Sequence, residues 1–265
     1  YKLSILSLSL TLLSPIIRSC ACFIAFGNWA KILSNRYGIW HPLKVIRKIE
    51  RVNFFNNFTF DLPAGSIVSI IGPNGAGKTT TFYLVVGLVR PDKGQVRIGS
   101  EDLTGDPMHI RARKGIGYLP QETSIFRKLT VRDNILAILE MLPMNRHERR
   151  TRSEMLLEEL GIAHLAGQRA AVLSGGEKRR LEISRTLAID PAFILLDEPF
   201  AGVDPLAVID IKNIIGHLKQ RGIGVLITDH NVRDTLDICE KAFIVGEGHI
   251  IAAGSAEHVL NDAKV

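Results

Sequence analysis

The sequence predicts an α/β fold in which helices cover a mostly parallel sheet and a helical subdomain interrupts it. From Leu43 onward, short apolar runs alternate with amphipathic helical stretches, which is typical of a parallel sheet with crossover helices. Three of the apolar runs, Ile67–Ile71, Phe193–Leu196 and Val225–Thr228, are predicted to be buried strands. Ligands bind at the carboxyl ends of strands in open α/β sheets, so we expect the functional site where these strands end.

The stretch from about residue 122 to 178 differs, because its apolar residues recur at helical spacing. Helices are predicted at 131–142 and 152–160. A basic cluster, Arg146–Arg152, lies between them and is predicted to be a solvated loop and helix start. These observations predict a helical subdomain inserted into the α/β core.

The composition excludes several classes of protein. Hydrophobic residues make up 46% of the chain and charged residues 23%, which is ordinary for a globular protein and excludes a disordered, collagen-like or disulfide-scaffold chain. The three cysteines, Cys20, Cys22 and Cys239, are too few and too poorly spaced for a zinc site, which favours a reducing compartment.

Positive charge is concentrated near the start of the chain. Residues 1–60 carry eight basic residues and one acidic residue, so they account for more than the whole net charge of +6. No basic stripe runs through residues 61–265, so we expect no nucleic acid among the partners.

Residues 1–40 do not match the rest of the chain, and three interpretations stay open. Their apolar stretch resembles a secretory signal. As a membrane span it is marginal, because Arg18 splits it. The first methionine of the chain is Met108. A third interpretation is therefore that the stretch precedes the native start of translation, or that the chain is a fragment. We therefore treat 1–40 as an N-terminal extension, disordered or not native, and place the folded domain at 41–262.

A phosphate-binding loop follows the first predicted strand. Residues 72–79 fit the pattern G-x-x-x-x-G-K-[ST] and precede a predicted helix, which is the context that the pattern requires. Glycines let backbone N–H groups turn toward phosphates, and the helix N-terminus adds its positive dipole end. Lys78 is expected to reach the β and γ phosphates, and Thr79 to offer its hydroxyl to Mg²⁺.

Two further motifs point to nucleotide chemistry. Asp197 ends an apolar strand and is expected to hold Mg²⁺, while Glu198 is expected to polarise an attacking water as a general base. Ser174 is expected to cap the helix that begins at Gly175, where two glycines leave N–H groups uncovered. That helix start is predicted to be a second anion site, and it suggests that a second molecule supplies the phosphate.

Together these motifs resemble the ATP-binding cassette (ABC) ATPases, over roughly residues 43–262. Six motifs occur in the family's order and rough spacing: Gly72–Thr79, Gln121 within Tyr118–Glu122, Leu173–Glu177, Leu196–Pro199, Ala201–Asp204 and His230. The resemblance implies a P-loop (RecA-like) core, a small antiparallel β subdomain and an inserted helical subdomain. It also implies a head-to-tail homodimer that encloses two ATP molecules.

The resemblance assigns roles to individual residues. Glu198, His230, Gln121 and Lys78 would be catalytic, and Thr79, Gln121 and Asp197 would hold Mg²⁺. Asp204 would act across the dimer interface. Nucleotide would be bound by Gly72, Pro73, Asn74, Gly75, Ala76, Gly77, Lys78, Thr79 and Thr80 of one chain and by Ser174, Gly175 and Gly176 of the other.

Three segments, Tyr118–Leu129, Leu195–Pro205 and Ile227–Arg233, more closely resemble the ATPases of lipopolysaccharide exporters. This implies a cytoplasmic subunit on the inner face of the inner membrane, docked near Phe126 and Arg127 to two integral membrane subunits similar to LptF and LptG. Importers of branched-chain amino acids remain an alternative, and a non-transport ABC ATPase is a weaker one. The family's adenine-stacking aromatic would fall near Ile49, which is not aromatic, and Trp40, Tyr37 and Phe54 stay open as substitutes.

Overall fold

The computed structural model describes residues 43–48 and 58–260. The chain divides into two units, residues 1–40 and 41–265, and every described element belongs to the second. The predictions made for residues 1–40 lie outside the described residues.

A six-stranded sheet forms the centre of this unit. Its strand order is β10-β9-β3-β8-β7-β6, and all neighbouring strands are parallel except β9 and β10. The strands are β3 (Ile67–Ile71), β6 (Ile116–Leu119), β7 (Phe193–Asp197), β8 (Gly224–Asp229), β9 (Lys241–Gly246) and β10 (His249–Gly254). The three strands predicted from the sequence are β3, β7 and β8, which lie side by side, so their polar carboxyl ends share one edge of the sheet.

A second sheet is small and antiparallel, as the family resemblance implied. Its order is β2 (Phe58–Leu62), β1 (Leu43–Lys48), β4 (Lys93–Ile98) and β5 (Glu101–Asp102). Phe60 of β2 is buried, and its ring centroid lies 6.0 Å from that of Phe243 on β9. This aromatic contact joins the two sheets.

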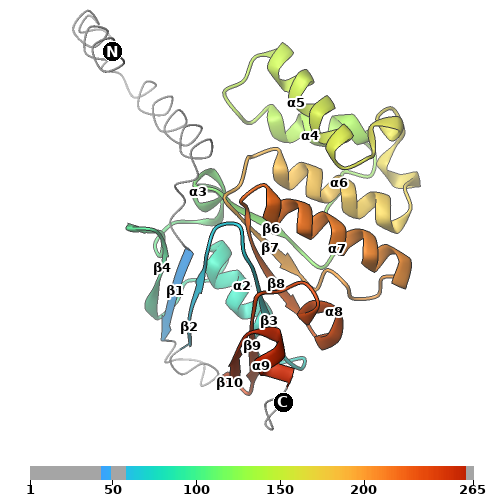
Figure 1. Ribbon diagram of the computed structural model, residues 1–265. Coiled ribbons are helices and arrows are strands. Elements are labelled where there is room, and N and C mark those ends of the chain that lie inside the picture. Colours follow the sequence, from blue (N-terminus) through green and yellow to red (C-terminus); the bar gives the residue numbers. More distant parts are fainter. Residues whose placement is uncertain (1–42, 49–57, 261–265) are drawn as a thin grey trace, which may run out of the picture. The chain divides into compact units, whose positions relative to one another are not determined.

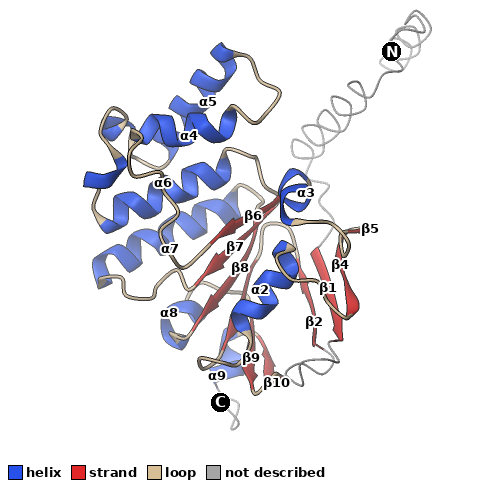
Figure 2. Ribbon diagram, turned by 180° about the vertical axis from the view of Figure 1, so that it is seen from behind, coloured by secondary structure: helices blue, strands red, loops and turns tan. Residues whose placement is uncertain are grey.

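Helices cover both faces of the central sheet. Figure 2 shows α2 (Lys78–Val86) between the two sheets, near α3 (Met108–Arg113). On the other face, α6 (Gly175–Leu187) and α7 (Pro205–Gln220) pack on the sheet, and α8 (Val232–Leu236) and α9 (Ala256–Leu260) follow toward its end. Alternate strand residues such as Ile194 and Leu196 pack against α6 and α7 in one apolar cluster. Burial on both faces explains why the parallel strands are continuously apolar.

The inserted helical subdomain is present, with helix boundaries that differ from the prediction. α4 (Val131–Leu139) and α5 (Arg146–Glu159) pack on α6, and Figure 1 shows them beyond α6 from the sheet. The basic cluster Arg146–Arg152 is a helix start, as predicted, but the predicted loop ahead of residue 152 is wrong, because α5 begins at Arg146. The helix predicted at 131–142 ends earlier, at Leu139. Asn145 accepts from the amide of Glu148, and the Glu148 carboxylate accepts from the amide of Asn145, so a capping box fixes the helix start.

Candidate active site

The phosphate loop, residues 72–77, connects β3 to α2. Gly75 and Gly77 have φ angles of 83° and 94°, in the left-handed region that favours glycine. Gly72 is required for another reason, since a Cβ there would lie 2.2 Å from the carbonyl oxygen of Val245 on β9. The strand, loop and helix predicted for the phosphate motif are therefore confirmed, and the glycines match the backbone shape.

Lys78 joins the phosphate loop to the end of β7. Its side chain is 4% exposed, and its Nζ donates to the carbonyl oxygens of Gly72 at 2.7 Å and Pro73 at 3.1 Å. The same ammonium lies 3.9 Å from Oε1 of Glu198. Lys78 thus provides positive charge next to the loop, and Thr79 follows it in the first turn of α2.

Asp197 ends β7 as a buried carboxylate with two hydroxyl donors. Its Oδ1 accepts from the Thr228 hydroxyl at 2.7 Å, and its Oδ2 accepts from the Tyr118 hydroxyl at 3.4 Å. Burial raises the pKa of Asp197 above its usual range, and the two hydroxyl groups oppose that rise. Burial and the Asp197 charge also raise the pKa of Tyr118, so this phenol remains a donor.

Glu198 follows Asp197 in a strained backbone conformation. Its φ is 45°, which costs a side chain other than glycine about 1–2 kcal/mol. The Glu198 amide donates to the Thr228 carbonyl at 2.8 Å, which holds the turn in place. Strain of this kind concentrates at functional sites, because surrounding contacts must maintain it.

The other residues predicted to be catalytic lie around the Glu198 carboxylate. Gln121 Nε2 donates to Glu198 Oε2 at 2.9 Å, and His230 Nδ1 lies 3.6 Å from the same oxygen. With Lys78 at Oε1, the four side chains form one cluster, drawn from the loop after β6, the end of β7, the end of β8 and the start of α2. The structure therefore brings together residues up to 152 positions apart in the sequence, between Lys78 and His230.

The segment Ser174–Gly176 forms a separate part of the predicted site. Ser174 accepts from the Glu177 amide, and Glu177 Oε2 accepts from the Ser174 amide at 2.7 Å, which makes a capping box. This hydrogen bond lowers the pKa of Glu177. Among the described residues, no hydrogen bond or ion pair joins this segment to the phosphate loop, so the structure does not bring these two parts together within one chain.

The structure places three further predicted residues around the site. Thr79 and Thr80 lie in the first turn of α2, and Asp204 is exposed just before α7. The aromatic residues Tyr37, Trp40 and Phe54 lie outside the described residues.

Phe126 and Arg127 are exposed on a loop that is anchored to the helical subdomain. The Phe126 amide donates to Asn134 Oδ1 on α4 at 2.8 Å. The Arg185 guanidinium on α6 lies 4.4 Å from the centroid of the Phe126 ring. The Ser124 amide donates to the buried Glu182 carboxylate on α6 at 2.7 Å. The loop after Gln121 is therefore held against α4 and α6.

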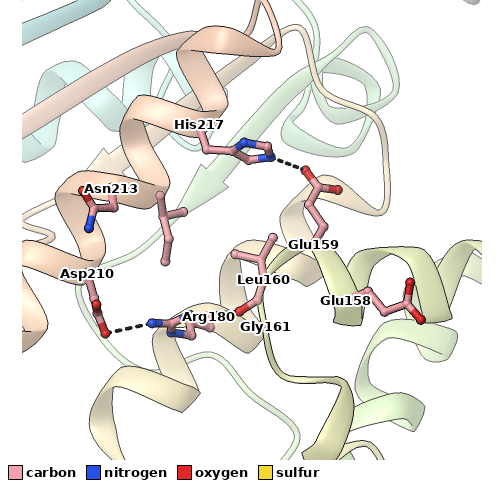
Figure 3. Close-up of a pocket in the computed structure, with 9 residues that line it drawn as sticks. Glu158, Glu159, Leu160, Gly161, Arg180, Asp210, Asn213 and His217 are labelled. Carbon is pink, nitrogen blue, oxygen red and sulfur yellow. Dashed lines mark hydrogen bonds and ion pairs between the residues drawn. The ribbon is translucent and has the colours of Figure 1, made fainter.

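A surface pocket of about 360 Å³ lies elsewhere, between α5, α6 and α7 (Figure 3). An ion pair between Arg180 and Asp210 and a hydrogen bond between His217 and Glu159 lie in it, each at 2.8 Å. Its lining shares no residue with the predicted site and consists of Glu158, Glu159, Leu160, Gly161, Arg180, Asp210, Asn213, Ile214 and His217.

Three residues of the site were not predicted from the sequence. Tyr118 and Thr228 orient Asp197, and the buried Asp229 carboxylate accepts hydrogen bonds from the segment after Glu198 and from the turn at His230. The available signal was their position, since each is one of the last two residues of a strand and lies within three positions of a predicted site residue.

Comparison with known proteins identifies relatives that match most of the chain. The family described as ABC transporter matches residues 55–201. The lipopolysaccharide export system ATP-binding protein LptB of Haemophilus influenzae is 59% identical over 203 residues, which cover 76% of this chain and 84% of that protein. The protein of the same name from Escherichia coli K12 is 57% identical over 203 residues, with the same coverage of both chains.

Solved structures show the same architecture. The ATP-binding cassette MJ1267 of an ABC transporter, in its ADP conformation, has a TM-score of 0.76 and 29% identity, covering 86% of this chain and 97% of its own. CbiO1 from Clostridium perfringens, part of the ABC transporter complex cbiONQ, has a TM-score of 0.78 and 25% identity, covering 85% and 93%. The predicted cassette fold is confirmed.

Proposed function

Because the chain belongs to the family of ABC transporter ATP-binding proteins and is an ATPase, we propose that it drives lipopolysaccharide export from the inner membrane. The relatives at 56–59% identity carry that function in their names. The observation that supports the catalytic part is the cluster of Lys78, Gln121, Glu198 and His230 beside the phosphate loop.

We assign the roles of the cluster from the family resemblance, and the geometry supports them. Glu198 is the general base, since its carboxylate lies at the carboxyl edge of the sheet, 3.9 Å from the ammonium of Lys78, which is expected to bind the phosphates. Lys78 and the N–H groups of the loop stabilise negative charge on the transferred phosphoryl group. His230 contacts the γ-phosphate, and Gln121 positions the attacking water through its bond to Glu198.

The residues present fit a Mg²⁺ ion. Asp197 supplies a carboxylate and Thr79 a hydroxyl. Since Gln121 Nε2 faces Glu198, its amide oxygen is left for the ion. Within residues 43–48 and 58–260, no group of three or more His, Cys, Asp or Glu is arranged around a metal site. This suits Mg²⁺, which is bound by one or two carboxylates together with substrate phosphates and water. When bound, the ion neutralises charge on the β and γ phosphates.

A homodimer completes the site in this proposal. Ser174, Gly175 and Gly176 offer a helix N-terminus that has no bond to the phosphate loop of the same chain. An anion at such a terminus is stabilised by free N–H groups and by the helix dipole. The segment therefore serves the ATP bound by a second copy, with Asp204 at the interface.

Two integral membrane subunits supply the transport path. Among the described residues, no helix is both long and apolar enough to cross a bilayer. We place the subunit on the cytoplasmic face of the inner membrane, docked through Phe126 and Arg127. Phe126 is 45% exposed on a loop fixed to α4 and α6, so movement of the helical subdomain would reach the membrane subunits through it.

A tagged pull-down from host membranes, followed by mass spectrometry, tests the transport assignment. We expect two multi-span proteins with large periplasmic domains, and we expect Phe126→Ala to reduce their recovery. Met141→Ala is the control, because Met141 is 75% exposed and lies just after α4. Recovery of importer permeases with a periplasmic amino-acid-binding protein would contradict lipopolysaccharide export while leaving ATP hydrolysis in place.

A further inference from the structure

Asp229 is a buried carboxylate that the proposed reaction does not use. It is the last residue of β8 and has 0% exposure. Its Oδ1 accepts from the backbone amides of His230 at 2.8 Å and Asn231 at 2.9 Å, and its Oδ2 accepts from the amide of Phe200 at 3.2 Å. All three donors are uncharged, and burial of a charge is costly unless hydrogen bonds compensate for it. This one carboxylate therefore holds three backbone amides together.

The three donors belong to two segments that carry different parts of the site. His230 and Asn231 form the turn between β8 and α8. Phe200 lies in the segment 198–204, which begins at Glu198 and ends at Asp204. The Phe200 side chain is 4% exposed and anchored in the core. Asp229 is therefore the joint between the Glu198 segment and the His230 turn, beside the bond from the Glu198 amide to the Thr228 carbonyl.

We propose that Asp229 is a positioning residue for ATP hydrolysis, which fixes the segment 198–204 against the His230 turn. The proposal rests on the roles proposed above for Glu198 and His230. His230 Nδ1 lies 3.6 Å from both Glu198 Oε2 and Asp229 Oδ1, so the imidazole is placed against the two carboxylates that this joint brings together. Displacement of reacting groups by about 1 Å can lower the rate roughly 100-fold.

A carboxylate is required at this position, because both of its oxygens must accept. Asparagine has nearly the same shape but only one acceptor oxygen. In one orientation its NH₂ group would face the Phe200 amide, and in the other it would face the amides of His230 and Asn231. Asp229→Asn thus breaks the joint with little change in side-chain volume.

The test compares steady-state ATP hydrolysis and ADP binding of the full chain. For Asp229→Asn we expect kcat to fall at least about ten-fold, while KM and the ADP Kd stay within about two-fold, since Asp229 does not contact the phosphate loop. Asp237→Asn is the matched control, because Asp237 is 60% exposed on the far end of α8 and pairs with Lys212. Wild-type kcat in a folded Asp229→Asn variant would overturn the proposal.

A double-mutant cycle separates positioning from general destabilisation. In the His230→Ala background, we expect Asp229→Asn to lower kcat by a clearly smaller factor than in the unmodified protein, because one of the two groups that it positions against each other is gone. The same fold-loss in both backgrounds would overturn the proposal. Wild-type kcat for His230→Ala alone would refute the role of His230 and with it this inference. A slow His230→Ala variant beside a wild-type Asp229→Asn variant would refute only the role of Asp229.

Amide hydrogen exchange of the unmodified protein provides a test if Asp229→Asn does not fold. We expect the amides of Phe200, His230 and Asn231 to be protected and to open in one cooperative step, since one carboxylate holds all three. Fast exchange at Phe200 beside slow exchange at His230 would show that the two segments are not joined, and would overturn the proposal.

Discussion

Thr228 is expected to keep Asp197 ionised, and Thr228→Val tests this directly. The substitution preserves the branched shape but removes the hydroxyl that donates to Asp197 Oδ1 at 2.7 Å. Thr228 has 0% exposure and Asp197 4%, so water cannot easily replace the lost donor. Hydrogen bonds to charged groups contribute about 1.5–3 kcal/mol, which is the loss expected in the free energy of unfolding at neutral pH.

The loss should depend on pH in a defined direction. Burial already raises the pKa of Asp197 above its ordinary 3.8, and removal of the hydroxyl raises the pKa further. A carboxyl group with a raised pKa in the folded state stabilises the fold at low pH and loses that contribution as pH rises through the folded pKa. The stability gap between Thr228→Val and the unmodified protein should therefore widen as the pH is raised from about 4 to 7.

Thermal and urea unfolding at several pH values measure that gap. At 2–4 °C per kcal/mol, the expected fall in Tm at neutral pH is roughly 3–12 °C. Thr235→Val is the matched control, since Thr235 is equally buried but donates to a neutral carbonyl, that of Asn231, at 2.7 Å. Its loss should be about 1 kcal/mol and independent of pH. Equal pH profiles for the two variants would refute the electrostatic role of Thr228.

Two further predictions concern the support of the phosphate loop. Gly72→Ala should strongly destabilise the protein in thermal unfolding, because its Cβ would lie 2.2 Å from the Val245 carbonyl oxygen. Gly75→Ala is the comparison, since a Cβ there meets open space and should cost only about 1–2 kcal/mol for the positive φ. Equal losses in the two variants would contradict the steric account. Arg111→Met should lower the free energy of unfolding by about 3–5 kcal/mol. Arg111 is 1% exposed, and its guanidinium donates to the carbonyls of Leu84 and Val85 at the end of α2, which would lose this donor in the variant. A decrease in the free energy of unfolding of less than about 1 kcal/mol would contradict this role.

The sequence prediction was correct mainly for features that residues close together in the sequence determine. The phosphate loop, the three central strands and the Ser174 helix cap all depend on side chains within a few positions. The start of α5 was missed although its signal was local, because Asn145 and Glu148 have capping-box spacing. β6 was missed because Gly117 interrupts its apolar run. A Cβ at that glycine would lie 2.7 Å from Thr186 Cγ2 on α6.

The remaining features of the site depend on contacts between distant segments. Thr228 meets Asp197 because β7 and β8 pair in a register that places these residues opposite each other. Asp229 reaches the Phe200 amide across the same pair of strands. Neither partner can be identified from spacing in one sequence, since strand register is fixed only when the whole sheet packs.

The most direct test of the catalytic assignment is the comparison of ATP binding and ATP turnover in Glu198→Gln. The amide keeps the size of the side chain but cannot accept a proton from water. We predict an ATP Kd within about three-fold of the unmodified protein and a kcat lower by roughly 10²–10⁴-fold, the range that general-base catalysis contributes. Glu154→Gln is the control, because Glu154 is 45% exposed on α5 and pairs with Arg150 on the same helix, away from the site. A Glu198→Gln variant that binds ATP and turns it over at the unmodified rate would contradict the account.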